Sequence, residues 1–125
     1  MDIVIDMDIV IDADSAVPPY EQVRMRIAEL AAAGSLAAGT RLPPVRQLAA
    51  ELGLAANTVA RAYRELEQAG LVETRGRAGT LITARAGRTP VEAQWAAQRY
   101  AEQATALGLT PEAALELVRA ALRLR

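Results

Sequence analysis

The chain has 125 residues and a formal net charge of −1, and it contains no cysteine, histidine or lysine. Without cysteine there is no disulfide framework and no thiolate chemistry, and without histidine the usual neutral-pH general base and commonest metal ligand are missing. No stretch approaches the roughly 20 apolar residues of a membrane span, and no signal segment opens the chain. We therefore expect a cytoplasmic protein with no membrane partner, no cofactor and no bound metal.

The charge is distributed unevenly along the chain. Residues 1–19 carry five Asp and no basic residue, residues 20–90 carry ten Arg and six Glu, and residues 91–125 carry four Arg and four Glu. The middle of the chain is locally basic, so the acidic pI is compatible with a polyanionic partner. All the basic residues are Arg, which suits bidentate contacts to phosphate or guanine but can equally reflect a GC-rich genome.

The chain opens on two copies of the hexapeptide MDIVID, at residues 1–6 and 7–12. Ile and Val alternate with Asp in each copy, which predicts at least one short strand in an acidic N-terminal arm over residues 1–17. Because acidic side chains repel phosphate, we expect this arm to lie away from any DNA-binding surface.

Three helices are predicted next, over about residues 20–33, 43–52 and 55–69. Prolines precede or open the first two, and Gly34, Gly53 and Gly70 follow the three helices as stop signals. The apolar residues recur at helical spacing and predict one buried face for each helix. These residues are Val23, Ile27 and Leu30, then Val45, Leu48, Ala49 and Leu52, then Val59, Tyr63 and Leu66.

The stretch LVETRGRAGTLITA, residues 71–84, predicts a strand, a turn over residues 76–79, and a second strand. A hairpin that follows two helices joined by a tight glycine turn is the layout of a winged helix-turn-helix domain. The predicted fold is therefore mainly α with a small β-wing, and we place this domain at residues 18–86.

Two further helices are predicted in a C-terminal tail over residues 87–125. TPVE at 89–92 is a capping box that begins a helix to about Leu107, and TPEA at 110–113 begins another that runs to the C-terminus. The apolar face of this tail is too wide for one partner helix, so we expect a dimer interface, with docking onto the chain's own domain as the alternative. The interface residues we expect are Trp95, Tyr100, Leu107, Leu115, Val118 and Leu122.

Residues 19–83 resemble the DNA-binding domain of GntR-family transcriptional regulators. The resemblance rests on three motifs together: G-x-L-x-x-G-x-x-L-P from Gly34, V-R-x-L-A from Val45, and N-T-V-x-R-A-Y-x-x-L-E-x-x-G-L-V from Asn57. Only about forty residues follow the wing, which is similar to the short YtrA-type subfamily. The resemblance implies a homodimeric regulator, more often a repressor, that binds double-stranded DNA at an inverted repeat near a transporter operon.

The DNA-binding residues we expect come from both helices of the pair and from the wing. The family position at Arg46 contacts DNA, and Asn57 and Thr58 begin the recognition helix, whose N-terminal residues read the major groove. Arg61 lies one turn after Asn57, and wings carry basic residues toward the minor groove or the backbone. The full set is Arg46, Asn57, Thr58, Arg61, Arg75, Gly76 and Arg77.

Each of these residues also has a structural interpretation. Asn57 could be an N-cap, Thr58 could merely begin the helix, and Arg46 could pair with Glu51. We expect Arg64 to form a solvated ion pair with Glu67. The wing could be merely solubilising.

The chain departs from the family pattern at three places. Pro44 and Gln47 replace a Ser–Glu capping box, Ala55-Ala56 replace a Ser-Arg pair, and the wing glycines are shifted to Gly76 and Gly79.

The alternative function is a winged helix that binds protein and shows no DNA sequence preference, because a fold alone does not settle function. An enzyme is excluded, since no nucleophile is paired with a base. A small-molecule effector is left open, with Trp95 as its stacking partner, although we favour Trp95 as an anchor of the dimer interface.

Overall fold

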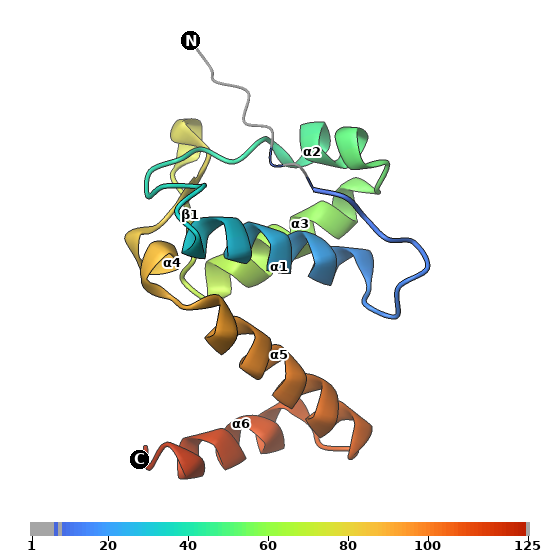
Figure 1. Cartoon of the computed structure of the whole chain (residues 1–125), viewed down its shortest axis with the longest axis vertical. Helices are drawn as coiled ribbons and strands as arrows, with labels where there is room; N and C mark the ends of the chain where they lie inside the picture. The colour runs from blue at the N-terminus through green and yellow to red at the C-terminus, as the bar shows by residue number, and fades with distance from the viewer. Residues whose placement is uncertain (1–6, 8, 125) are drawn as a thin grey trace. The chain divides into compact units, whose positions relative to one another are not determined.

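A computed structural model describes Met7 and residues 9–124, and Figure 1 shows its elements in chain order. The described chain divides into two compact units, one up to Val91 and one from Glu92. No helix in the described part is long and apolar enough to cross a membrane. The first unit contains α1 (Pro19–Ala32), α2 (Val45–Leu52), α3 (Ala56–Gln68), β1 (Val72–Thr74), the 3-10 turn η1 (Gly76–Ala78), β2 (Thr80–Ile82) and α4 (Ala84–Arg88). The second contains α5 (Val91–Ala106) and α6 (Pro111–Ala121).

The core of the first unit lies where α1 and α2 pack against α3. The predicted apolar faces are confirmed, because the residues at helical spacing are the ones that the fold buries. Val23, Ile27, Leu48, Ala49, Val59, Tyr63 and Leu66 are buried, and Leu30, Val45 and Leu52 are partly buried against the same core.

The turn between α2 and α3 is made by Gly53. Its φ of 69° is in the left-handed region that favours glycine. The amide of Leu54 donates to the carbonyl of Ala49 at 2.9 Å, which closes α2 in a Schellman turn. The predicted end of α2 is confirmed, and α3 begins only three residues after Gly53.

A buried hydrogen bond links α3 to the segment that leads into α2. The hydroxyl of Tyr63 donates to the carbonyl oxygen of Pro43 at 2.7 Å. The ring of Tyr63 packs in the core and is only 7% exposed. A buried carbonyl without a donor is costly, so this bond favours one orientation of α3 relative to α2.

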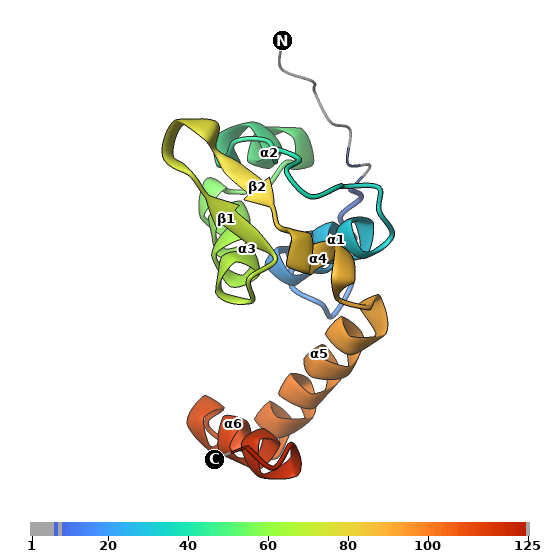
Figure 2. The same cartoon turned by 90° about the vertical axis from the view of Figure 1, so that its left-hand side faces the viewer.

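The predicted hairpin is confirmed. Strands β1 and β2 pair antiparallel, with Val72 opposite Ile82 and Thr74 opposite Thr80. The loop before α2 also pairs with the sheet, because Arg41 forms an isolated antiparallel bridge with Leu81 of β2. Figure 2 shows the hairpin beside α3, with its turn at the same end of the unit as α2.

The predicted N-terminal strand is wrong for the second MDIVID copy, and the first copy lies outside the described residues. Met7 and residues 9–12 form no strand, although Met7 is buried and Ile9 and Ile11 pack partly against the core. Alternate residues of this segment, Met7, Ile9 and Ile11, therefore pack on the core without forming a strand. The segment is not paired with β1, which has β2 as its only strand partner in the described sheet, so its apolar residues contribute by packing on the core.

The short helix α4 was not predicted. Its N-cap is Thr83, whose hydroxyl accepts from the amide of Ala86 at 3.3 Å and donates to the carbonyl of Gly70 at 2.7 Å. Ala86 is buried against the core. Five residues with two Arg and one Gly give no apolar periodicity, so nothing local marks this helix.

The second unit is a helical hairpin. Gly108 has a φ of 80°, and the amide of Leu109 donates to the carbonyl of Ala104 at 3.0 Å. The predicted start of α6 is confirmed, because the hydroxyl of Thr110 accepts from the amide of Ala113 at 3.1 Å. The two helices are joined by the hydroxyl of Tyr100, which donates to the carbonyl of Ala114 at 2.8 Å.

The Tyr63 bond predicts an alkaline loss of stability. Burial raises the pKa of Tyr63, and the charge of Glu51 raises it further, from an ordinary value of 10.0. Above about pH 10 the unfolded chain releases this proton while the folded chain keeps it, so stability is complete below pH 10 and falls as the pH rises. The decline is at most about 1.4 kcal/mol per pH unit.

Tyr63→Phe should flatten this decline and should cost about 1–3 kcal/mol at neutral pH, because the carbonyl of Pro43 loses its donor. Urea denaturation between about pH 7 and 11 measures both effects, and the absence of Lys, Cys and His leaves tyrosine as the side-chain type that titrates there. Tyr20→Phe is the control, since Tyr20 is less buried and should flatten the decline less. An unchanged slope in Tyr63→Phe would contradict the assignment.

Candidate nucleic-acid interface

The outward face of α3 combines small and cationic residues. Val59, Ala62, Tyr63 and Leu66 hold the opposite face in the core, so the outward face follows from the helical period. Ala55 and Ala56 are exposed, which leaves room for close approach by a partner. The exposed polar residues of this face are Asn57, Arg61, Arg64 and Gln68.

The N-termini of α2 and α3 have neither side-chain caps nor acidic residues in the first turn. Pro44 and Ala55 hold the two N-cap positions, so the interpretation of Asn57 as an N-cap is wrong. Asn57 is the second helical residue and is exposed, and Thr58 follows it half-buried. Uncapped helix N-termini present backbone amides and a positive dipole end, which favour anions such as phosphate.

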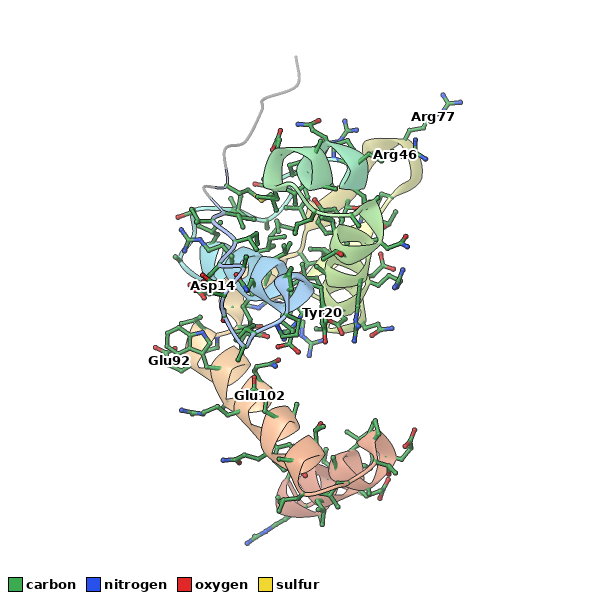
Figure 3. The ribbon with its side chains drawn as sticks, turned by 90° about the vertical axis from the view of Figure 1, so that its right-hand side faces the viewer. Asp14, Tyr20, Arg46, Arg77, Glu92 and Glu102 are labelled. Atoms are coloured by element: carbon green, nitrogen blue, oxygen red, sulfur yellow. The ribbon has the colours of Figure 1, made fainter. Side chains whose placement is uncertain are left out.

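Arg46 lies in the first turn of α2 and is exposed. The alternative of an ion pair with Glu51 is not found among the described residues, because Glu51 accepts from the side-chain amide of Gln47 at 3.2 Å. Figure 3 shows Arg46 and Arg77 at the same end of the unit, one on α2 and one on the wing. The structure thus brings together two of the residues expected to bind DNA.

Arg61 and Arg64 have different environments, and of the two it is Arg64 whose expected contact is contradicted. The guanidinium carbon of Arg61 lies 3.7 Å from the centroid of the Tyr20 ring, so Arg61 leans against α1. Arg64 was expected to pair with Glu67, but Glu67 accepts from the hydroxyl of Thr74 at 2.7 Å. Arg64 has no ion pair within 4.0 Å in the described part of the chain, so that prediction is wrong.

The wing turn between β1 and β2 spans residues 75–79. Residues 76–78 make one 3-10 turn, and the amide of Arg75 donates to the carbonyl of Gly79 at 2.8 Å. Arg75 pairs with Glu73 at 2.9 Å, whereas Arg77 is exposed at the tip. Gly79 has φ 83° and ψ −154°, a conformation essentially restricted to glycine.

Arg41 also belongs to this surface, and the sequence analysis did not include it. A Cβ on Gly79 would lie 2.9 Å from Nε of Arg41, so the Arg41 side chain covers the base of the wing. It reaches this place because residue 41 bridges to Leu81 across about forty residues of chain. No local pattern marks such a long-range pairing.

The charges on this end of the unit favour an anionic partner. Three nearby carboxylates have donors of their own: Glu51 binds Gln47, Glu67 binds Thr74 and Glu73 binds Arg75. Among the described residues, no three His, Cys, Asp or Glu side chains lie together as metal ligands would. The arrangement suits binding to a phosphate backbone, with small residues and an amide where a helix would face base edges. The exposed Arg residues of α2, α3, the wing and the segment before α2 are Arg41, Arg46, Arg61, Arg64, Arg75 and Arg77.

The sequence of this chain is similar to those of known proteins. Residues 19–82, which run from α1 to β2, match the family described as "Bacterial regulatory proteins, gntR family". The chain is 50% identical over 105 residues to the HTH-type transcriptional regulator Rv1152 of Mycobacterium tuberculosis, covering 84% of this chain and 86% of that protein. It is 46% identical over 83 residues to the HTH-type transcriptional repressor YtrA of Bacillus subtilis, covering 66% of this chain and 63% of that protein.

A solved structure is also similar. YtrA from Sulfolobus acidocaldarius, a GntR-family transcription factor, matches with a TM-score of 0.60 and 30% sequence identity. The match covers 77% of this chain and 97% of that chain. The likeness therefore extends over nearly the whole of a regulator of similar architecture.

The wing turn provides a test of this geometry. Gly79→Ala should cost about 1–3 kcal/mol, because its backbone conformation suits only glycine and the new methyl group would meet Arg41. Gly76→Ala is the matched control: its φ is 46° and nothing lies within 4 Å of an added Cβ, so it should cost less. Hydrogen exchange of the Arg75 amide, which donates to Gly79, measures wing opening, and faster exchange in Gly76→Ala than in Gly79→Ala would contradict the geometry.

Proposed function

The chain belongs to the GntR family of bacterial transcriptional regulators, and we propose that it acts as a homodimer that binds an inverted-repeat operator and represses transcription. As a member of this family it is a DNA-binding regulator and not an enzyme, which confirms the resemblance seen in the sequence. The observation that carries the proposal is that Arg46 at the start of α2 and Arg77 on the wing lie at the same end of the first unit, with the N-terminus of α3 following α2 after the Gly53 turn. The name of the relative YtrA, a repressor, supports the proposed direction of control.

The proposed DNA contacts divide by groove. The N-terminus of α3 enters the major groove, where the exposed Asn57 can pair with adenine and Thr58 can bind a phosphate. Arg46 binds a phosphate or a guanine from the start of α2. Arg75, Gly76 and Arg77 bring the wing to the minor groove or the backbone, where the negative potential attracts Arg.

Dimerisation is proposed for the tail, residues 87–125, because its apolar face remains exposed. Leu107, Leu115 and Leu122 are 79%, 58% and 64% exposed. The hydroxyl of Tyr100 donates to the carbonyl of Ala114, so Tyr100 stabilises the helical hairpin that carries this apolar face. Exposed apolar patches of this kind mark interaction sites, and a two-fold dimer matches the symmetry of an inverted repeat.

Three further parts of the proposal follow the sequence analysis. The winged domain is placed at residues 18–86 and the acidic arm at residues 1–17. The regulated genes are proposed to be a neighbouring transporter operon, as in the short subfamily. Trp95, which is 47% exposed, is proposed as an anchor of the dimer interface, to which Val118 is also assigned. A small-molecule effector is the alternative partner for the Trp95 ring.

The DNA-binding role of Arg46 can be tested by substitution. Arg46→Ala should weaken operator binding by about 1–3 kcal/mol without lowering the midpoint of thermal unfolding, because the side chain is exposed. Titration of a labelled duplex at fixed salt measures the loss. Arg26→Ala is the matched control, since Arg26 pairs with Glu29 on α1 at 3.6 Å. Equal affinities of Arg46→Ala and Arg26→Ala would remove Arg46 from the interface.

The dimer can be tested at the centre of the apolar face. Leu115→Glu should convert the dimer to a monomer, since a charge buried in an apolar interface is costly. Sedimentation at several protein concentrations measures the change. Val10→Glu is the control, because Val10 is 82% exposed and lies in the other unit. A Leu115→Glu protein that stays dimeric would show that the interface lies elsewhere.

A further inference from the structure

Asn57 and Arg64 lie on the same stripe of α3. They are seven residues apart, close to two turns, so their side chains leave the helix within about 20° of each other and roughly 10 Å apart along the axis. Both are exposed, and of the residues between them on this face, Ala60 is small and Arg61 stacks on the Tyr20 ring. Any partner that meets Asn57 along this face therefore also faces Arg64.

Arg61, one turn after Asn57, makes two contacts within the protein although its side chain is 52% exposed. Its guanidinium stacks on the Tyr20 ring at 3.7 Å, and its Nε lies 3.7 Å from Oε1 of Glu65. Glu65 in turn pairs with Arg24 of α1 at 3.5 Å. Figure 3 shows Tyr20 at the start of α1, beside α3. Reaching for DNA would require Arg61 to give up both contacts.

Arg64 forms no ion pair and no ring contact of this kind among the described residues. Glu67, three residues after Arg64, instead accepts a hydrogen bond from the hydroxyl of Thr74 on β1. The charge of Arg64 is therefore exposed without an ion pair within 4.0 Å in the described part of the chain. This is the reverse of the division that the sequence predicted for Arg61 and Arg64.

We propose that Arg64 contacts a DNA phosphate at the edge of the major groove, and that Arg61 instead holds the recognition helix against Tyr20. The inference rests on the proposed function, because it requires α3 to lie in the groove. A major groove about 12 Å wide places phosphates about as far from the base edges as Arg64 lies from Asn57. An Arg at that place adds affinity and salt dependence but no base preference.

The experiment compares two Arg-to-Ala variants on one helix. Arg64→Ala, Arg61→Ala and the wild-type protein are titrated with two duplexes of equal length, the sequence that the wild type enriches from a random pool and a shuffled version of it. Binding is measured between about 50 and 200 mM salt, the range over which phosphate contacts are resolved. Thermal unfolding of each variant is recorded alongside, and Arg64→Lys tests rescue by charge.

For Arg64→Ala the logarithmic salt slope should fall by about 0.9 for each protomer bound, equally on both duplexes, with an unchanged unfolding midpoint. Arg64→Lys should restore the slope, because a phosphate accepts either cation. Arg61→Ala should keep the wild-type slope and lower the unfolding midpoint.

Other outcomes overturn the inference in distinguishable ways. If Arg64→Ala keeps the wild-type slope, Arg64 is not a phosphate contact, although the proposed function stands. If Arg64→Ala loses affinity only for the enriched duplex, Arg64 reads a base instead. If the wild type prefers neither duplex, the proposed function itself fails.

Discussion

The buried bond between the Tyr63 hydroxyl and the Pro43 carbonyl is the constraint on which the DNA-facing surface depends. It joins the middle of α3 to the residue just before the N-cap of α2, at 2.7 Å. The Gly53 turn allows the two helices to meet, but the bond and the packing of the Tyr63 ring fix the angle between them. Every exposed residue of α3 and α2 takes its direction from this angle.

The same constraint explains how a chain with a net charge of −1 can present a cationic surface. Arg46 on α2 and Arg77 on the wing lie at the same end of the unit, and Arg64 extends from the exposed face of α3. The nearby carboxylates are directed to donors within the protein, as Glu51 is to Gln47 and Glu67 is to Thr74. Local arrangement therefore outweighs net charge in determining which partner the surface suits.

Most of the fold could be predicted from the sequence because its signals are local. A glycine follows within two residues of the end of α1, α2 and α3, and their buried residues recur at helical spacing, as Val59, Tyr63 and Leu66 do in α3. The wing is similarly marked by its turn residues. In the second unit, Thr110 predicted the start of α6 because an N-cap is a property of a few adjacent residues.

The parts that could not be predicted depend on contacts between distant segments. The ring of Tyr20 is forty-one positions before Arg61, and no pattern in either helix indicates that they stack. Arg41 reaches the wing through a single bridge to Leu81. The N-terminal alternation predicts a strand, but whether alternating residues pair with a sheet or only pack on the core depends on where the segment lies in the fold, which the sequence does not reveal.

We propose above all that this chain reads DNA sequence as a two-fold dimer. The most direct test is selection from a random duplex pool by the purified protein at near-physiological salt, followed by sequencing of the bound fraction. We expect enrichment of an inverted repeat whose half-sites lie about one helical turn apart, roughly 10 base pairs. A bound fraction with the same sequence distribution as the starting pool would contradict it.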